Sequence, residues 1–254
     1  MLNIMGLGLR GVKSLTLEEE KVIKGSDIIY FETYTSISPN DTFNSIAAIA
    51  NGDIKIADRS FVETDKEIID QAKEKKVTFL VTGDALSATT HNELRMEAIK
   101  AGVSVEIYEN ASIITAFPSR TGLFNYKFGT IVSMPFIHKN FFPVSVYDKI
   151  YTNYSNNMHT LLLLDLEDGK TMPVYEALSN LVKMEARRGK QLIKPEMLII
   201  AGTGIASANE KIIYGTLERL IELKPVGSPS SIIIPSKMND MECSFLNAFC
   251  RNID

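Results

Sequence analysis

Three glycines near the start of the chain have a spacing that is typical of dinucleotide-binding proteins. Gly6, Gly8 and Gly11 form a G-x-G-x-x-G pattern directly after a β-rich run. In this pattern the glycines let a pyrophosphate approach the backbone at the start of a helix. Glu32 ends the next β-rich run, where an acidic residue can bind a ribose hydroxyl. Taken alone, the pattern favours a nicotinamide-dependent oxidoreductase.

The residues that follow the third glycine argue against that function. Thr16 and Glu19 form a capping box, in which each side chain accepts a hydrogen bond from the other residue's amide. The helix is therefore expected at residues 17–24, and residues 12–15 become a loop between Gly11 and the helix. Nicotinamide or flavin chemistry is disfavoured, because the helix N-terminus is too far along the chain. The glycines still predict that a ligand can approach the backbone after this strand.

A second candidate site follows an apolar strand expected at residues 77–82. The strand leads into Gly83 and Asp84, and then into a loop of small residues that contains Ser87. Ligands of open α/β sheets bind beyond the carboxyl ends of the strands, so Asp84 is placed to accept hydrogen bonds from a ligand. The alternative is a turn in which Gly83 relieves backbone strain and Asp84 caps the next helix. The pattern alone favours the turn.

Two further loops follow predicted strands. Ser112 comes just after the strand at 103–108, where it could cap a helix or present its amide to a ligand. Gly202 and Gly204 lie in a small-residue loop after the apolar strand at 197–201. That loop lacks the Gly-Lys-Ser/Thr ending of a phosphate-binding loop, so binding of a nucleoside triphosphate is disfavoured.

Composition excludes several functional classes. The 254 residues are 45% hydrophobic and 23% charged, as in an ordinary globular protein. The net charge of -4 predicts no general affinity for nucleic acid or for an anionic membrane, and no apolar run could span a bilayer. The three histidines are scattered, so we expect no metal site. Cys243 and Cys250 are expected to be reduced thiols in a cytoplasmic protein.

Apolar runs alternate with amphipathic segments along the whole chain, which predicts an α/β protein. Several of the runs are continuously apolar, as in strands covered on both faces of a sheet. Strands are expected at residues 2–9, 27–32, 77–82, 103–108, 131–134, 159–166, 197–201 and 231–234. Helices are expected at residues 17–24, 65–75, 91–101, 173–188, 216–222 and 239–249.

In their order and spacing, these segments resemble the diphthine synthase family. The resemblance is carried by MLNIMGLGL, IIYFETYTS, DRSFVE, FLVTGD, ATTH and ENASI. It continues through GLFNYKFGTIVSMPF, FFPVSVYDKI, HTLLLLDL and EARRGK, and fades after about residue 201. Because so many ordered segments match, the resemblance is far more specific than any single motif.

The resemblance implies two α/β domains of the tetrapyrrole methylase type, at residues 1–112 and 113–254, with S-adenosylmethionine in the cleft between them. It also implies a cytoplasmic homodimer whose substrate is elongation factor 2. A methyl group would pass to the amine of a 3-amino-3-carboxypropyl-histidine and give diphthine. Carried over position by position, the cofactor contacts fall on Leu9, Asp84, Ser87, Ser112, Ile113, Leu164, Ile205 and Ser231.

The chain departs from the family pattern in three places. Ala85 stands where the family has the proline of Gly-Asp-Pro, which is expected to loosen the turn. Gly204 stands in place of an arginine, and Ser231 in place of a histidine. These departures leave open a tetrapyrrole methyltransferase of the same fold, or a binding module that has lost activity. The residues do not identify the base that deprotonates the amine, the number of methyl groups, or whether a carboxylate is methylated as well.

Overall fold

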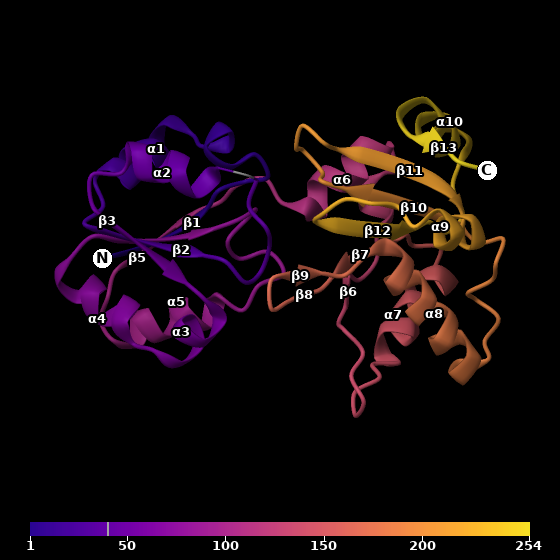
Figure 1. Ribbon diagram of the computed structural model, residues 1–254, viewed down its shortest axis with the longest axis horizontal. Helices are drawn as coiled ribbons and strands as arrows, with labels where there is room; N and C mark the ends of the chain where they lie inside the picture. Colours follow the sequence, from indigo (N-terminus) through magenta and orange to yellow (C-terminus); the bar gives the residue numbers. More distant parts are fainter. Residues whose placement is uncertain (40) are drawn as a thin grey trace. The chain divides into compact units, whose positions relative to one another are not determined.

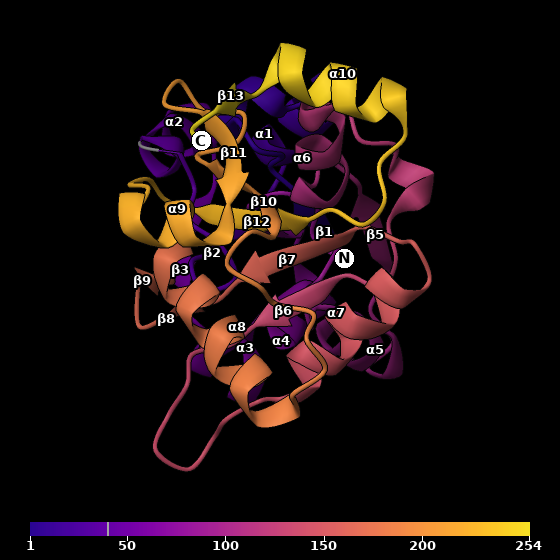
Figure 2. The ribbon, with the colours of Figure 1, turned by 90° about the vertical axis from the view of Figure 1, so that its right-hand side faces the viewer.

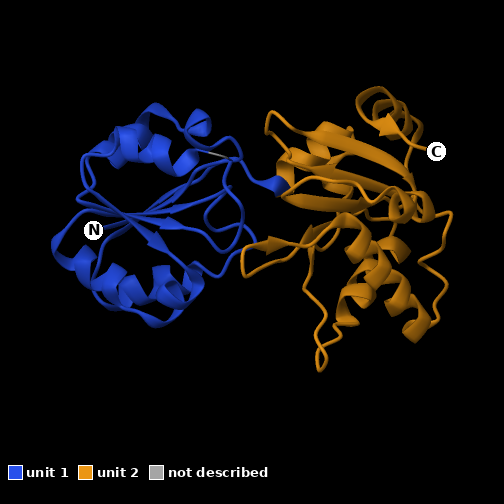
Figure 3. Ribbon diagram, in the orientation of Figure 1, with its two compact units in different colours: residues 1–113 blue, residues 114–254 orange. Residues whose placement is uncertain are grey.

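The computed structural model describes residues 1–39 and 41–254, and it divides the chain into two compact units (Figure 3). Unit 1 is Met1–Ile113 and unit 2 is Ile114–Asp254. The division lies within one residue of the boundary expected between residues 112 and 113.

Unit 1 is built on a parallel sheet whose strand order is β3-β2-β4-β1-β5 (Figure 1). Parallel pairing brings the carboxyl ends of neighbouring strands to the same edge of the sheet. All residues of β1, β2 and β4 are buried, which confirms that continuous apolar runs form strands covered on both faces. The strands are β1 (Leu2–Gly6), β2 (Ile28–Glu32), β3 (Asp53–Ala57), β4 (Val77–Val81) and β5 (Val105–Tyr108).

Helices cover both faces of this sheet (Figure 1). On one face, Ile23 and Ile46 pack against Met5 and Leu80. On the other face lies the second core of the unit, which includes Ile4. The first face is covered by α1 (Leu17–Lys24) and α2 (Thr42–Ile49), and the second by α3 (Arg59–Thr64), α4 (Glu67–Glu74) and α5 (Asn92–Lys100).

Unit 2 contains a mixed sheet in the strand order β13-β11-β10-β12-β7-β6 (Figure 2). Strand β10 pairs antiparallel with both β11 and β12, and β12 pairs antiparallel with β7. The strands are β6 (Val132–Met134), β7 (Thr160–Leu164), β10 (Leu198–Thr203), β11 (Lys211–Thr216), β12 (Ser230–Ile234) and β13 (Arg251–Asn252). A separate hairpin joins β8 (Leu166–Glu167) to β9 (Lys170–Thr171).

The main core of unit 2 lies between this sheet and three helices. Leu178 and Leu181 of α8 are fully buried in it, together with Tyr147 of α7 and Leu220 of α9. The helices α6 and α10 lie on the other face of the sheet (Figures 1 and 2). The bounds are α6 (Ile113–Thr121), α7 (Ser145–Ser155), α8 (Val174–Arg188), α9 (Leu217–Leu223) and α10 (Asp240–Phe249).

Three of the elements that the sequence pattern failed to predict, β3, α6 and α7, have weak local signals. The edge strand β3 carries few buried residues, so its pattern is not strongly apolar. Helix α6 contains Pro118, which normally breaks a helix. Helix α7 is rich in Tyr, Asn, Ser and Thr, which are mediocre helix formers, and it is stabilised by burying Tyr147 and Ile150. The predicted loop at residues 12–15 is wrong in part, because Gly11–Ser14 forms a 3-10 turn.

Candidate functional site

The loops after β1 and β4 are joined directly by their backbones. The amide of Gly8 donates to the carbonyl of Gly83 at 3.0 Å, and the amide of Gly83 donates back at 2.9 Å. A Cβ on Gly6 would lie 2.5 Å from the Gly83 carbonyl oxygen, and a Cβ on Gly8 would lie 2.5 Å from Oδ1 of Asn110. Both glycines are therefore required by the close approach of the chain to itself. These contacts explain the glycines without a ligand, whereas the sequence pattern predicted that a ligand approaches the backbone here.

The delayed start of α1 is confirmed. The Glu19 amide donates to Oγ1 of Thr16 at 3.1 Å, and the Thr16 amide donates to Oε2 of Glu19 at 2.5 Å. Gly11 has a φ of +56° and is the first residue of the 3-10 turn, outside α1. The three glycines therefore do not present a helix N-terminus in the way that a dinucleotide-binding loop does.

Asp84 lies at the carboxyl end of β4, and its half-buried carboxylate ties two loops together. Oδ1 accepts a hydrogen bond from the Leu86 amide at 3.1 Å, and Oδ2 accepts one from the Asn110 amide at 3.2 Å. The turn expected for Asp84 is therefore present, but the residue does not cap α5, whose N-cap position is His91. Each carboxylate oxygen has a further lone pair, so Asp84 can also accept from a ligand.

Asn110 was missed by the sequence analysis as an organising residue. Its Nδ2 donates to the carbonyl of Gly6 at 3.1 Å and to Oε1 of Glu19 at 3.1 Å. It thereby fixes the end of β5 against the loop after β1 and the start of α1. An asparagine just beyond a strand is a common turn residue, so the sequence alone gave no reason to single it out.

The turn at Ala85 is held by hydrogen bonds although it lacks the family's proline. The Ala85 carbonyl accepts from Oγ1 of Thr89 at 2.7 Å and from Nδ1 of His91 at 2.8 Å. Because a carbonyl only accepts, Nδ1 carries the proton, and Nε2 of His91 can accept from the Tyr34 hydroxyl at 3.2 Å. His91 is 1% exposed, and burial lowers its pKa. His91 occupies the N-cap position of α5, and its side chain is a buried support of the Asp84 loop.

A cavity of about 360 Å³ lies beside Asp84. It is also lined by Ala85, Leu86 and Arg95, and by residues of β5 with Glu109. Among the described residues that line this cavity, Asp84 is the only predicted cofactor contact. The other predicted cofactor contacts lie outside the cavity.

The other predicted residues of unit 1 lie at the same edge of the sheet as Asp84. Leu9 follows β1 and approaches Gly83, since a Cβ built on Gly83 would lie 3.9 Å from Cδ2 of Leu9. The Ser87 amide donates to the Asp84 carbonyl at 3.4 Å. Ser112 directly precedes α6 and Ile113 is its first residue. Parallel pairing thus brings the loops after β1, β4 and β5 together, as the sequence predicts.

The remaining predicted residues gather at one end of the sheet in unit 2. Ser231 of β12 is paired with Gly202 of β10 and with Leu163 of β7. Leu164 is the last residue of β7, and Ile205 follows β10. Both Ile205 and Ser231 are 7% exposed. The antiparallel register therefore brings together residues that are far apart in the sequence.

The loop after β10 carries a local strain. Gly204 has a φ of +57°, and Ala206 has a φ of +69°, a region that favours glycine. The Ala206 amide donates to Oε2 of Glu210 at 2.5 Å, and Nε of Arg120 donates to the same oxygen at 2.7 Å. Glu210 and Arg120 thus hold the loop in which the chain lacks the family's arginine.

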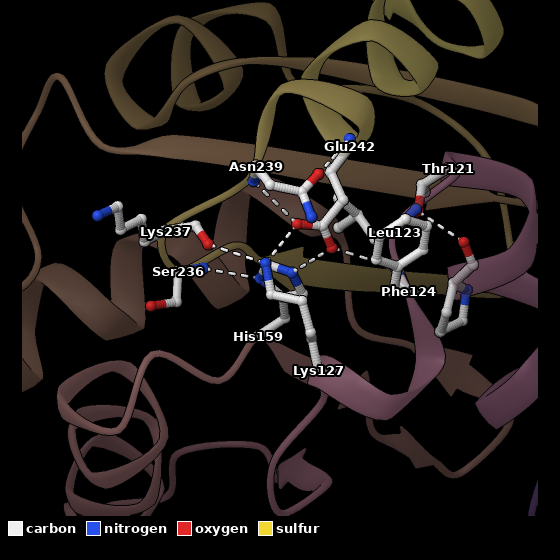
Figure 4. A network of polar contacts seen from close by, with 10 residues as sticks. Thr121, Leu123, Phe124, Lys127, His159, Ser236, Lys237, Asn239 and Glu242 are labelled. Atoms are coloured by element: carbon white, nitrogen blue, oxygen red, sulfur yellow. Dashed lines mark hydrogen bonds and ion pairs between the residues drawn. The ribbon is translucent and has the colours of Figure 1, made fainter.

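Unit 2 also contains a buried ionic network around His159 and Glu242 (Figure 4). The Ser236 amide donates to Nδ1 of His159 at 2.9 Å, so Nε2 carries the proton and donates to Oε1 of Glu242 at 3.0 Å. Lys127 forms an ion pair with Oε2, and the Asn239 amide donates to the same oxygen at 3.1 Å.

The pKa values in this network follow from burial and hydrogen bonding. Burial lowers the pKa of His159, although Glu242 opposes the shift. Burial would raise the pKa of Glu242, but hydrogen bonds from Lys127, Asn239 and His159 outweigh it and lower the pKa to about 2. Both side chains are fully buried, at 0% exposure, so no substrate can reach them. The network fixes α10 to the strand β7, and it is structural.

Two kinds of feature are absent from the described residues, 1–39 and 41–254. In this part of the chain no group of three or more His, Cys, Asp or Glu side chains could hold a metal ion. None of its helices is both long enough and apolar enough to cross a membrane.

Comparisons with known proteins agree with one another. The family model of the tetrapyrrole (corrin/porphyrin) methylases matches residues 1–221. The chain is 41% identical to the diphthine synthase of Thermoplasma acidophilum over 253 residues, which cover 100% of this chain and 97% of the relative. It is 35% identical to the diphthine synthase of Methanocaldococcus jannaschii, with 100% of both chains covered.

The fold agrees with the same group of proteins. A solved crystal structure of a diphthine synthase superimposes on the chain with a TM-score of 0.86 at 28% sequence identity. The superposition covers 100% of this chain and 97% of the other. The similarity therefore extends over both units.

Proposed function

The chain belongs to the tetrapyrrole methylase family and, within it, to the diphthine synthases, and from this premise we propose the reaction that it catalyses. It is a methyltransferase of diphthamide biosynthesis. It transfers a methyl group from S-adenosylmethionine to the amine of a 3-amino-3-carboxypropyl-histidine in elongation factor 2. The observation that carries this proposal is the identity of 41% to a diphthine synthase over the whole chain.

The residues at the edge of the unit 1 sheet fit the cofactor chemically. S-adenosylmethionine carries hydroxyl and ammonium donors, and its sulfonium supplies an activated methyl group. The Asp84 carboxylate is half-buried, and its spare lone pairs can accept from such donors. In this proposal Leu9, Ser87, Ser112 and Ile113 line the cofactor site with it.

The second part of the proposed cofactor site is the end of the unit 2 sheet. Leu164, Ile205 and Ser231 are carried over from the family resemblance, and the register of β7, β10 and β12 supports them. Ser231 can donate and accept a hydrogen bond, but it cannot carry the charge of the family's histidine. We therefore expect Ser231 to bind the cofactor more weakly than a histidine at this position would.

The contribution of the chain to catalysis is orientation. Methyl transfer is an in-line displacement, and correct placement of the reacting groups can contribute on the order of 7–11 kcal/mol. The hydrogen bonds of Asp84, Asn110 and His91 hold the loops of the site in one arrangement before any ligand binds. We assign no residue to the deprotonation of the amine.

Methyl transfer from radiolabelled S-adenosylmethionine tests the proposal. The acceptor is elongation factor 2 that carries the aminocarboxypropyl-histidine, and unmodified factor is the control. We expect label on the modified factor alone, and mass spectrometry of the product then counts the methyl groups. Absence of label, in a protein that binds S-adenosylmethionine, would contradict the proposed substrate. Label on a precorrin would favour a tetrapyrrole as the substrate.

We also propose that the protein acts as a homodimer, as the family resemblance implies. Light scattering of the purified protein measures its mass directly, and a mass near the 28.2 kDa of a single chain would contradict this.

A further inference from the structure

A second cavity, of about 500 Å³, lies in unit 2 and is separate from every residue of the proposed cofactor site. Its walls come from β10, β11 and α9, from residues 224–226, and from the segment 251–254. Its volume is within the range of about 300–1,000 Å³ that is usual for small-molecule sites. Nothing in the proposed methyl transfer uses it.

The charged walls of this cavity are mostly positive. Lys211, Arg219, Lys224 and Arg251 line it, against the single carboxylate side chain of Asp254. The Asp254 carboxylate is engaged by Thr216, whose amide donates to both of its oxygens at 3.0 Å. Arg219 is paired with Glu222 at 3.3 Å, whereas Lys211, Lys224 and Arg251 form no ion pair within residues 1–39 and 41–254. The cavity therefore carries unbalanced positive charge.

A buried hydroxyl in the wall of the cavity lacks a partner. Thr203, in β10, is 3% exposed, and its Oγ1 makes no hydrogen bond to any described residue. Leaving a buried hydroxyl unpaired costs about 1–3 kcal/mol. Native proteins usually satisfy such groups, and a ligand in the cavity or a buried water would satisfy this one.

The rest of the wall is apolar. Ala201 and Ile213 face the cavity from β10 and β11, and Leu223 and Val226 stand at its border. Val226 is 84% exposed and Leu223 is 47% exposed. A ligand with an apolar or ring-shaped body would cover these side chains.

From the charge, the hydroxyl and the apolar wall together, we propose that this cavity binds a nucleoside monophosphate or a similar phosphorylated small molecule. The phosphate would lie among Lys211, Arg219 and Arg251, because guanidinium and ammonium groups bind phosphate by charge-assisted hydrogen bonds. The base or another ring would lie against Ile213 and Val226. A simple carboxylate would leave much of the positive charge unbalanced, so the phosphate is the better match.

Calorimetric titration with uridine 5′-monophosphate and with inorganic pyrophosphate tests this assignment. A pyrimidine probe is chosen because an adenine probe would also report on the proposed cofactor site. We expect the nucleotide to bind more tightly than pyrophosphate, and its affinity to fall as sodium chloride rises from 50 to 200 mM. Saturating S-adenosylhomocysteine is expected to leave this affinity unchanged.

Matched variants locate the binding. The double variant Lys211→Gln/Arg251→Gln is expected to weaken nucleotide binding at least tenfold and to leave methyl transfer unchanged. The control Lys149→Gln/Lys194→Gln removes the same charge from exposed positions of unit 2 outside the cavity and is expected to change neither. Thr203→Val keeps the shape of the side chain, so it is expected to weaken binding while leaving folding stability equal or higher.

Three results would overturn the proposal. In the first, the nucleotide fails to bind at concentrations up to 10 mM. In the second, the charge variant and its control bind it equally, and in the third, S-adenosylhomocysteine displaces it. Pyrophosphate that binds as tightly as the nucleotide would show that the apolar wall contributes nothing. Failure of the methyl-transfer assay would leave this test unaffected, because the two sets of residues do not overlap.

Discussion

At the scale of single residues, Asp84 combines a structural and a proposed binding role. Its two oxygens hold the loops after β4 and β5 through the amides of Leu86 and Asn110. The sequence presented these as alternatives, a turn or a ligand contact. The geometry makes them compatible, since a carboxylate can accept several hydrogen bonds at once.

Asp84→Asn removes the charge and keeps part of the structural role. The amide oxygen still accepts from one backbone amide, but the NH2 group cannot accept from the other, and the negative charge toward a ligand is lost. Hydrogen bonds to charged groups contribute about 1.5–3 kcal/mol, so we expect S-adenosylmethionine to bind roughly 10–100-fold more weakly by calorimetry. Asp70→Asn, at an exposed ion pair with Lys73, is the control and should bind normally. Unchanged affinity in Asp84→Asn would remove this residue from the proposed site.

The buried pair of His159 and Glu242 predicts acid sensitivity. The lowered pKa of His159 means that the unfolded chain takes up a proton near the ordinary value of 6.5 while the folded chain does not. The contribution of His159 to the free energy of unfolding is therefore complete above this pH and is lost as the pH falls below it. The pKa of Glu242, lowered from 4.5 to about 2, acts in the same direction between those values.

Urea unfolding at pH 7.5 and pH 5.5 measures the His159 effect, since Glu242 does not titrate in that interval. We expect the wild-type free energy of unfolding to fall. His159 contributes at most about 1.4 kcal/mol to this fall for each pH unit, and the buried His91, whose pKa is also lowered, adds to it. His159→Gln should fall less, because it has no proton to gain. His138→Gln, at an exposed histidine, should fall as much as the wild type. An equal pH dependence in His159→Gln and wild type would contradict this account.

At the scale of elements, the site depends on how closely β1 and β4 approach at their carboxyl ends. The backbone bridge between Gly8 and Gly83 leaves no space for a side chain at Gly6. A Cβ on Gly6 would also lie 3.1 Å from the Cα of Asp84. The packing of two strands therefore determines where the carboxylate stands.

Gly6→Ala tests this packing. The added Cβ would lie 2.5 Å from the Gly83 carbonyl oxygen, so the strands must separate, at a cost of about 1–3 kcal/mol. Gly25→Ala is a matched control, because its φ of -91° suits alanine and its nearest neighbour would be 3.3 Å away. Thermal or urea unfolding compares the two variants. A Gly6→Ala protein as stable as Gly25→Ala would show that the loops can move apart freely.

At the scale of the whole molecule, each unit has its own hydrophobic core. The cores of unit 1 flank its parallel sheet, and the main core of unit 2 lies between its mixed sheet and α7, α8 and α9. We propose that residues 1–112 and 113–254 are two folding domains. A substitution that destabilises one core should then lower the stability of its own unit more than that of the other unit.

Leu178→Ala tests this independence, because Leu178 is fully buried in unit 2. The cavity should cost about 2–5 kcal/mol. Hydrogen exchange should become faster in β10 and β12, while the amides of β1 and β4 keep their protection. Loss of protection in both sheets to the same extent would show that the chain unfolds as one unit.

The sequence by itself determined the fold class, the family and the strand ends that carry the candidate site. Continuous apolar runs form buried strands whatever their neighbours, and the capping box at Thr16 is a local interaction, so both can be predicted from adjacent residues. Only the tertiary structure decided the rest. Asn110 contacts Gly6, Tyr34 contacts His91 and His159 pairs with Glu242 across long stretches of chain. Such contacts depend on strand order and register, and neither has a signal in the local sequence.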